Sequence, residues 1–383
     1  MKKSYFILAA VAATFAACSQ NDDVTQIADA PVAIGFDSQF VESVTRSENN
    51  TQDYTWNLED HHTTFGVWGY KIVNSTPSSV FAAQTVEWDN ITADDWDYEN
   101  HRFWDKGASS YEFYAAAPAT AGWTLNANTT AANDDYFTLT GFELDDHDAT
   151  TTIQATAVNS FATAAAGKDL LIAAPCTWTN YTTKVQLNFI HILSRLNVLI
   201  KKGDKLTDND KVYIQSLVVN GFKSTGSFDE HAAAAVNTTP GTAASGTDRW
   251  DALTGTVNYT GTFTAETAEA IDKTNAKYYL QSLVIPQTAA FEAIKVDGTD
   301  TATAPELVIT YQIHNDNWTG DKTETYTAHY NLAACFGKTT GETIDFNEGW
   351  QNNLTLIINP NAIMFDANVS PWSDGSANNF VIE

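Results

Sequence analysis

The feature that most constrains the fold is a pair of alternating apolar runs within residues 185–200, VQLNFIHILSRLNVLI. Val185, Leu187 and Phe189 alternate with polar residues, and the alternation resumes at Leu196 after a change of phase. A period of two residues places successive side chains on opposite faces of an extended chain, so each run predicts a β-strand. Many shorter runs of this kind are separated by turn residues. We therefore expect an all-β protein and no helical bundle.

The length and the turn content of the chain predict two domains. The chain has 383 residues, which is room for about two domains of ordinary size. Residues 201–211, KKGDKLTDNDK, combine charge with turn residues and are the best candidate for a linker. We therefore expect one β domain over residues 47–203 and a second over residues 204–383.

The charge balance excludes one class of partner. The chain carries 47 acidic and 20 basic residues, for a formal net charge of -27. The acidic residues are spread through the loops, so the surface repels nucleic acid and favours solubility outside the cell. We expect no nucleic-acid partner.

The three cysteines predict no metal centre. Cys18, Cys176 and Cys335 lie far apart and form no CxxC pair, so neither a zinc site nor a disulfide framework is indicated. A bridge between Cys176 and Cys335 stays open as an alternative, but two isolated buried thiols are favoured.

The amino-terminal residues predict export. Lys2 and Lys3 precede an apolar run that is too short to span a bilayer, so residues 1–17 are expected to be a signal peptide. The run ends in Phe-Ala-Ala-Cys, which resembles a bacterial lipoprotein cleavage box. This resemblance implies that Cys18 becomes acylated and begins a lipidated leader over residues 18–46. Several acyl chains would hold the precursor stably in the outer membrane.

A short strand is predicted inside this leader. Val32, Ile34 and Phe36 alternate with small or polar residues and form one apolar face. A polar stretch follows that contains Arg46 and Ser47, and we expect it to be open to a protease. Cleavage after Arg46 would let the strand leave three side-chain sockets and a row of unpaired backbone groups. A strand from another subunit could fill that groove.

Three evenly spaced tryptophans allow two interpretations. Trp88, Trp96 and Trp104 recur eight residues apart between acidic and turn residues. If exposed, they would stack against sugar rings, and if buried, they would belong to the core of successive strands. We favour the core, because aromatic side chains contribute mainly by burying area.

The sequence contains no motif of the common catalytic classes. It has no GxSxG, HExxH, P-loop or GxGxxG sequence. His191 has no partner motif nearby, so a packed or capping histidine is favoured over a catalytic base. We therefore expect no enzyme activity, no catalytic or metal-binding residue and no cofactor.

Three blocks of sequence carry a family resemblance. The first is WDYENHRFWDKGASSYEFYAAAP at residues 96–118, with GVWGY upstream at residues 66–70. The second combines DLLIA at residues 169–173 with VQLNFIHILSRLNV at residues 185–198, and the third runs from FNEGW to VSPW over residues 346–372. As a set these blocks resemble the fimbrillin family of Bacteroidetes, the subunits of type V pili and related surface fibres.

This resemblance implies a fold and a function. The fold is two transthyretin-like β-sandwich domains in tandem. The function is that of a pilin of a type V-like fimbria, cut after Arg46 by an arginine-specific protease and polymerised by strand exchange. Phe380, Val381 and Ile382 are the candidate donor strand. The implied partners are other fimbrial subunits, in a homopolymer or a mixed fibre, and a ligand on a host or bacterial surface.

Several alternatives stay open. Arg249 is a second candidate for cleavage, although the position of Arg46 after the first strand favours Arg46. Asp300-Thr301-Ala302 resembles the O-glycosylation motif of exported Bacteroidetes proteins, which makes Thr301 a candidate modification site. A tip or anchor subunit, which keeps its lipid or lacks a usable donor, is a rival function. A surface glycan-binding lipoprotein is a second rival.

Overall fold

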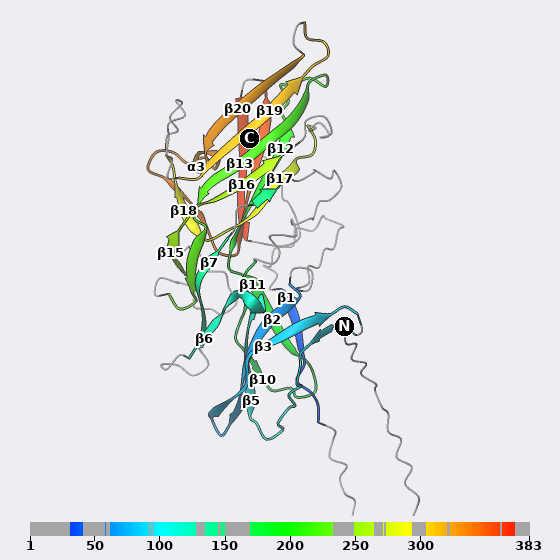
Figure 1. Ribbon diagram of the computed structural model, residues 1–383, viewed down its shortest axis with the longest axis vertical. Helices are drawn as coiled ribbons and strands as arrows, with labels where there is room; N and C mark the ends of the chain where they lie inside the picture. Colours follow the sequence, from blue (N-terminus) through cyan, green and yellow to red (C-terminus); the bar gives the residue numbers. More distant parts are fainter. Residues whose placement is uncertain are drawn as a thin grey trace, which may run out of the picture.

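The computed structural model is an elongated molecule built mainly from β-strands (Figure 1). It describes residues 31–40, 58, 62–91, 93, 95–127, 135–144, 147–149, 169–232, 249–263, 271, 273–292, 304–319, 322–360 and 362–371. Among the described elements, η1 (Ala119–Ala121) and α3 (Leu332–Cys335) are short helical turns that accompany the strands. The all-β class predicted from the alternating runs is confirmed.

One eight-stranded sheet forms the lower end of the molecule in Figure 1. In spatial order its strands are β1 (Phe36–Phe40), β11 (Val185–His191), β9 (Leu171–Ala173), β5 (Ser110–Ala117), β2 (Thr64–Val73), β3 (Thr76–Asp89) and β4 (Asp95–Asp97), with β10 (Cys176–Trp178) paired to β5. Its core is rich in aromatic rings. Gly69 on β2 lies against them, because an added Cβ would be 2.9 Å from Cδ1 of Phe113. This close approach explains the glycine in that strand.

The first strand joins the two edges of this sheet. β1 lies at one edge and β4 at the other. Trp96 on β4 donates from Nε1 to Oγ of Ser38 on β1 at 3.0 Å. Just before β1, Ala33 forms an antiparallel bridge with Phe103. The sheet therefore wraps around its core, and the segment that contains β1 closes the gap.

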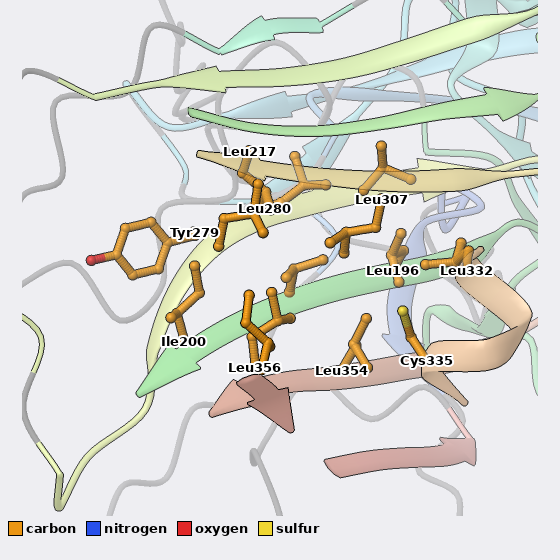
Figure 2. Packing of buried hydrophobic residues seen from close by; sticks show 14 of the residues in the cluster. Leu196, Ile200, Leu217, Tyr279, Leu280, Leu307, Leu332, Cys335, Leu354 and Leu356 are labelled. Carbon is orange, nitrogen blue, oxygen red and sulfur yellow. The ribbon is translucent and has the colours of Figure 1, made fainter. Parts of the chain in front are cut away.

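Two sheets form a sandwich at the upper end of the molecule. One contains β17 (Lys277–Val284), β12 (Ser194–Lys202), β22 (Trp350–Asn359) and β23 (Ala362–Pro371), and the other contains β20 (Thr323–Asn331), β19 (Glu306–His314), β13 (Lys211–Phe222), β16 (Val257–Thr262) and β8 (His147–Ala149). Figure 2 shows the core between them, where Leu196 and Leu354 of the first sheet approach Leu217 and Leu307 of the second. The phase change predicted inside residues 185–200 is the passage of the chain from β11 in the lower sheet to β12 in this sandwich.

A smaller sheet connects the two ends of the molecule. It contains β15 (Trp250–Thr254), β14 (Thr225–Asp229), β7 (Tyr136–Glu143) and β6 (Thr124–Asn126), and β18 (Gln287–Ala290) pairs separately with β21 (Thr343–Phe346). β7 pairs with β14, and β8 pairs with β16, so residues before position 203 share sheets with residues after it. A third apolar cluster, which includes Phe137, Ile192 and Trp250, fills this middle region. These pairings cross the expected boundary between residues 203 and 204.

Candidate functional site

The candidate site is the first segment that the structure describes, residues 31–40, and the groove that holds it. Ile34 and Phe36 are buried, with 1% and 0% of their surfaces exposed. Both belong to the aromatic core of the lower sheet. Val32 differs from the expectation, because 40% of its surface is exposed. The segment therefore fills two deep side-chain sockets, and the third socket expected at Val32 does not exist.

The socket of Phe36 is made of aromatic rings. The Phe36 ring packs nearly edge-on against Phe81 and Phe113, with centroids 5.4 and 5.6 Å apart. Phe65 lies edge-on at 6.4 Å and Tyr98 is tilted at 5.8 Å. Edge-to-face pairs add about 0.5–1.5 kcal/mol each beyond the area they bury. Phe36 is consequently the strongest side-chain anchor of the segment.

Backbone hydrogen bonds hold the segment on both sides. On one side Ile34 N donates to Arg102 O at 2.8 Å, and Trp104 N donates to Val32 O at 3.0 Å. On the other side Val185 N donates to Gly35 O at 2.8 Å, and β1 then runs parallel to β11 with Phe36 opposite Val185. Removing the segment would leave both neighbours with unpaired backbone groups.

Polar side chains fix the position of the segment along the groove. Gln186 donates from Nε2 to Oδ2 of Asp37 at 2.9 Å. The hydroxyl of Tyr98 donates to Ile34 O at 2.7 Å, and it accepts a hydrogen bond from Arg102 N at 3.1 Å. Burial raises the pKa of Tyr98 above its usual range, so this hydroxyl stays protonated and keeps its role as a donor at physiological pH.

Most of the modification and assembly residues predicted from the sequence lie outside the described residues. This holds for the lipidation residue Cys18, for the cleavage pair Arg46 and Ser47, and for Thr301. It also holds for the donor residues Phe380, Val381 and Ile382. Their roles stay predictions.

Arg249 is buried, which argues against it as a cleavage site. It is 7% exposed, and its Nε donates to Oε2 of Glu348 at 2.9 Å, while NH2 donates to Oε1 of the same carboxylate. The guanidinium also lies 5.2 Å from the ring centroid of Phe228. A protease needs an accessible, locally extended chain. The expectation that Arg249 is as exposed as a surface arginine is wrong.

The three tryptophans do not form an exposed platform. Trp96 and Trp104 are 5% and 7% exposed. Trp88 is half-buried, and its ring packs edge-on against Trp96 with centroids 5.2 Å apart. The core reading of these residues is confirmed, and they offer no flat surface to a sugar.

His191 and the cysteines have structural surroundings. His191 is buried, and its Nδ1 lies 2.8 Å from Oδ2 of the buried Asp169, which agrees with a packed histidine. Cys176 and Cys335 are free thiols, so the alternative of a bridge between them is wrong. Burial raises the pKa of Cys335 to about 12, which keeps this thiol unreactive at neutral pH.

The described ranges hold no group of three or more His, Cys, Asp or Glu side chains placed to bind a metal ion. Among the same residues no helix is both long enough and apolar enough to cross a bilayer.

Sequence reasoning missed the second edge of the groove at residues 102–104 and the contact between Trp96 and Ser38. The alternation of apolar residues carries no signal for either, because both depend on which distant segments meet.

Comparisons with known proteins find one matching family model and several similar proteins. A family model described as fimbrillin-like matches residues 45–372. The fimbrium subunit Fim1C of Phocaeicola vulgatus is 24% identical over 396 residues, covering 97% of this chain and 96% of that protein. The crystal structure of a fimbrial protein from Bacteroides vulgatus is similar with a TM-score of 0.48 and 16% identity, covering 89% of this chain and 100% of the other.

Proposed function

Because this chain belongs to the fimbrillin-like family, we propose that it is a structural subunit, a pilin, of a type V-like cell-surface fimbria. Its role is mechanical and not catalytic. It is exported as a lipoprotein that is acylated at Cys18, reaches the outer membrane and is cut between Arg46 and Ser47. Its partners are other subunits of the same fibre, and the fibre contacts a ligand on a host or bacterial surface.

One observation carries this proposal. The segment at residues 31–40 lies in the core as a closing strand, yet it precedes the segment in which Arg46 lies and is tied to the rest of the sheet by noncovalent contacts. Burial of Ile34 and Phe36 contributes about 1.5–3 kcal/mol each. A cut after Arg46 would let this strand leave, and the empty sockets and edges would favour a replacement strand.

The donor of that strand is residues 380–382 of a neighbouring subunit. Phe380 and Ile382 are spaced two residues apart, as are Ile34 and Phe36. Side chains with this spacing point to the same face of a strand. Each added subunit would then present its own donor to the next, and a fibre would grow.

We also infer two transthyretin-like sandwiches in tandem, over residues 47–203 and 204–383. Two large, separate cores support this division, one around Phe113 and one around Leu356. Three strands that precede position 204 pair across this division: β7 with β14, β8 with β16, and β12 with β17 and β22.

The test is processing of the purified precursor with trypsin. We expect a cut after Arg46, a new amino terminus at Ser47, and detergent-resistant ladders on a gel run without heating. Arg46→Gln should abolish both the cut and the ladders, while Arg102→Gln, which alters an exposed side chain beside the groove, should leave both intact. Surface protein with an intact acylated Cys18 in assembled fibres would contradict the proposal. Trimming without ladders would favour a tip or anchor subunit.

A further inference from the structure

The groove of the first strand has a direction. Along the strand, the side chains that point into the molecule are Ile34, Phe36 and Ser38. The first two fill apolar sockets, and the third accepts a hydrogen bond from Trp96 Nε1. In the direction in which the first strand runs, the three inward positions of the groove are therefore aliphatic, aromatic and polar.

The candidate donor has the same three characters in the opposite order. Residues 378–382 are Asn-Asn-Phe-Val-Ile. On one face of a strand they present Asn378, Phe380 and Ile382, which reads polar, aromatic, aliphatic. Resting on the strand exchange proposed above, we propose that residues 378–382 enter the groove in the direction opposite to the strand they replace. Phe380 then occupies the Phe36 socket and Ile382 occupies the Ile34 socket.

The polar positions also match in this direction. Asn378 takes the place of Ser38, where its amide oxygen accepts the hydrogen bond of Trp96 Nε1. Asn379 takes the place of Asp37, where it accepts from Gln186 as the carboxylate does in the precursor. Each donor at the groove keeps an acceptor, so the exchange leaves no buried polar atom newly unpaired at these two positions.

The outward position occupied by Gly35 accepts a larger residue. The three atoms nearest to a Cβ added at Gly35 all belong to the Lys184 side chain, and the nearest, Cγ, would lie 3.1 Å away. The Lys184 side chain is half-exposed and its Nζ is paired with the carboxylate of Asp95, so a larger residue at position 35 requires a small shift of this side chain. Val381 of the donor therefore fits where the first strand has glycine.

Entry in the same direction as the first strand fits poorly. With Phe380 in the Phe36 socket, Ile382 would replace Ser38, and the indole of Trp96 would lose its acceptor. With Phe380 shifted into the Ile34 socket, Ile382 would leave a void among the rings around Phe36. Reversal avoids both defects.

Reversal also improves the pairing with the neighbouring strand. The first strand runs parallel to β11. A reversed donor pairs antiparallel with β11, and antiparallel ladders are somewhat more stable per residue. On the β11 edge, exchange therefore replaces a weaker ladder by a stronger one, whereas on the edge at residues 102–104 the antiparallel bridge of Ala33 with Phe103 is replaced by a parallel contact.

The test is disulfide trapping in the full-length chain, trimmed by trypsin so that Cys18 leaves with the leader. The parent carries Cys176→Ser, and Cys335 is buried and stays in place. Gln186→Cys supplies one thiol on the outward face of β11, opposite position 37 of the first strand. The second thiol is Asn379→Cys or Val381→Cys. A reversed donor places position 379 opposite Gln186, whereas a donor in the original direction places position 381 there.

After mild oxidation, we expect the Gln186→Cys, Asn379→Cys chain to give covalent ladders on a heated, non-reducing gel. The Gln186→Cys, Val381→Cys chain should give about tenfold less, because its two Cα atoms would be diagonal neighbours beyond easy disulfide reach. Single variants are the controls. The opposite ranking overturns the proposal. Noncovalent ladders without either crosslink also overturn it, because another segment is then the donor. Absence of ladders from the trimmed parent refutes the strand exchange itself, and with it the proposed direction of the donor strand.

Discussion

At Phe36, a single buried ring packs against four other aromatic rings. We expect Phe36→Ala to lower the free energy of unfolding of the uncut precursor by about 3–5 kcal/mol, through lost burial and the cavity that remains. Urea unfolding followed by tryptophan fluorescence measures this change. Val32→Ala is the matched control on the same segment, and its half-exposed side chain should cost less than about 1 kcal/mol. Equal costs for the two variants would contradict the two-socket geometry.

The buried pair of Arg249 and Glu348 makes a second prediction. Arg249→Met leaves the carboxylate of Glu348, which is 1% exposed, without its cation. We expect a loss of about 3–5 kcal/mol in unfolding free energy. The double variant Arg249→Met, Glu348→Leu should recover most of that loss, since no charge is then buried alone. Chemical denaturation of the three chains tests this, and a double variant no better than the single one would be the contrary result.

The pH dependence of stability is predicted at Glu112. Burial on β5, together with the nearby carboxylate of Asp135, raises the pKa of Glu112 above its usual value. A raised pKa means that the folded chain holds this proton more tightly than the unfolded chain. The cost of the charged form is therefore full above the folded-state pKa, shrinks as the pH falls through it, and is gone below the unfolded-state pKa.

Glu112→Gln should consequently raise the melting temperature at pH 7 and have a smaller effect at pH 4. Calorimetric scans of both chains at the two pH values measure the difference. Glu87→Gln, at an exposed position on β3, is the control and should change little at either pH. A gain from Glu112→Gln that grows as the pH falls would reverse the assigned sign.

At single positions, the sequence predicts burial well where a residue sits in an alternating run. Ile34 and Phe36 are examples, because a period of two assigns them to one face. Val32 follows the same period but lies at the end of the segment, where Ala33 pairs with the exposed Phe103. The alternation of apolar residues does not indicate where a groove ends. Arg249 is missed for a different reason, since its partner Glu348 lies 99 residues away in the chain.

At the scale of elements, loss of the first strand should expose two backbone edges. Trp104 N and Val185 N donate to carbonyl groups of residues 32 and 35 in the precursor. We expect hydrogen exchange at these two amides to become at least about tenfold faster after trimming at Arg46. A chain that ends at residue 377 keeps the trimmed protein free of its own donor. Gly203 N, which donates to Ile358 O in the upper sandwich, is the internal control.

Unchanged exchange at Trp104 and Val185 would show that the strand stays bound after the cut. Faster exchange at Gly203 as well would indicate general unfolding instead of local opening. The assembled fibre of the complete chain should restore protection at Val185, because a donor strand again covers β11.

The existence of these strands could be predicted, but their partners could not. β11 and β12 follow directly from the two alternating runs of residues 185–200. β7 and β8 lie within residues 47–203, which were expected to form one domain, yet they pair with β14 and β16 beyond it. Pairing depends on the edges that are free when the chain folds, and a strand's own side-chain pattern contains no information about those edges.

At the scale of the whole molecule, the shared middle region should make unfolding cooperative. The sheet of β6, β7, β14 and β15 draws strands from both sides of position 203, and the cluster of Phe137, Ile192 and Trp250 lies between the two larger cores. Neither end can unfold without exposing this cluster, so we expect one calorimetric transition whose calorimetric and van't Hoff enthalpies agree.

Leu139→Ala probes this coupling, because Leu139 on β7 pairs with Phe228 on β14 and is 3% exposed. We expect a loss of about 2–5 kcal/mol, with near-ultraviolet signals from both ends of the molecule still lost at one temperature. Val369→Ala, at a partly exposed position on the outer strand β23, is the control and should lower the melting temperature by much less. Two well-separated transitions in the unaltered chain would instead mean that the two ends of the molecule unfold independently, and that β7 and β8 contribute little to the stability of the residues they pair with.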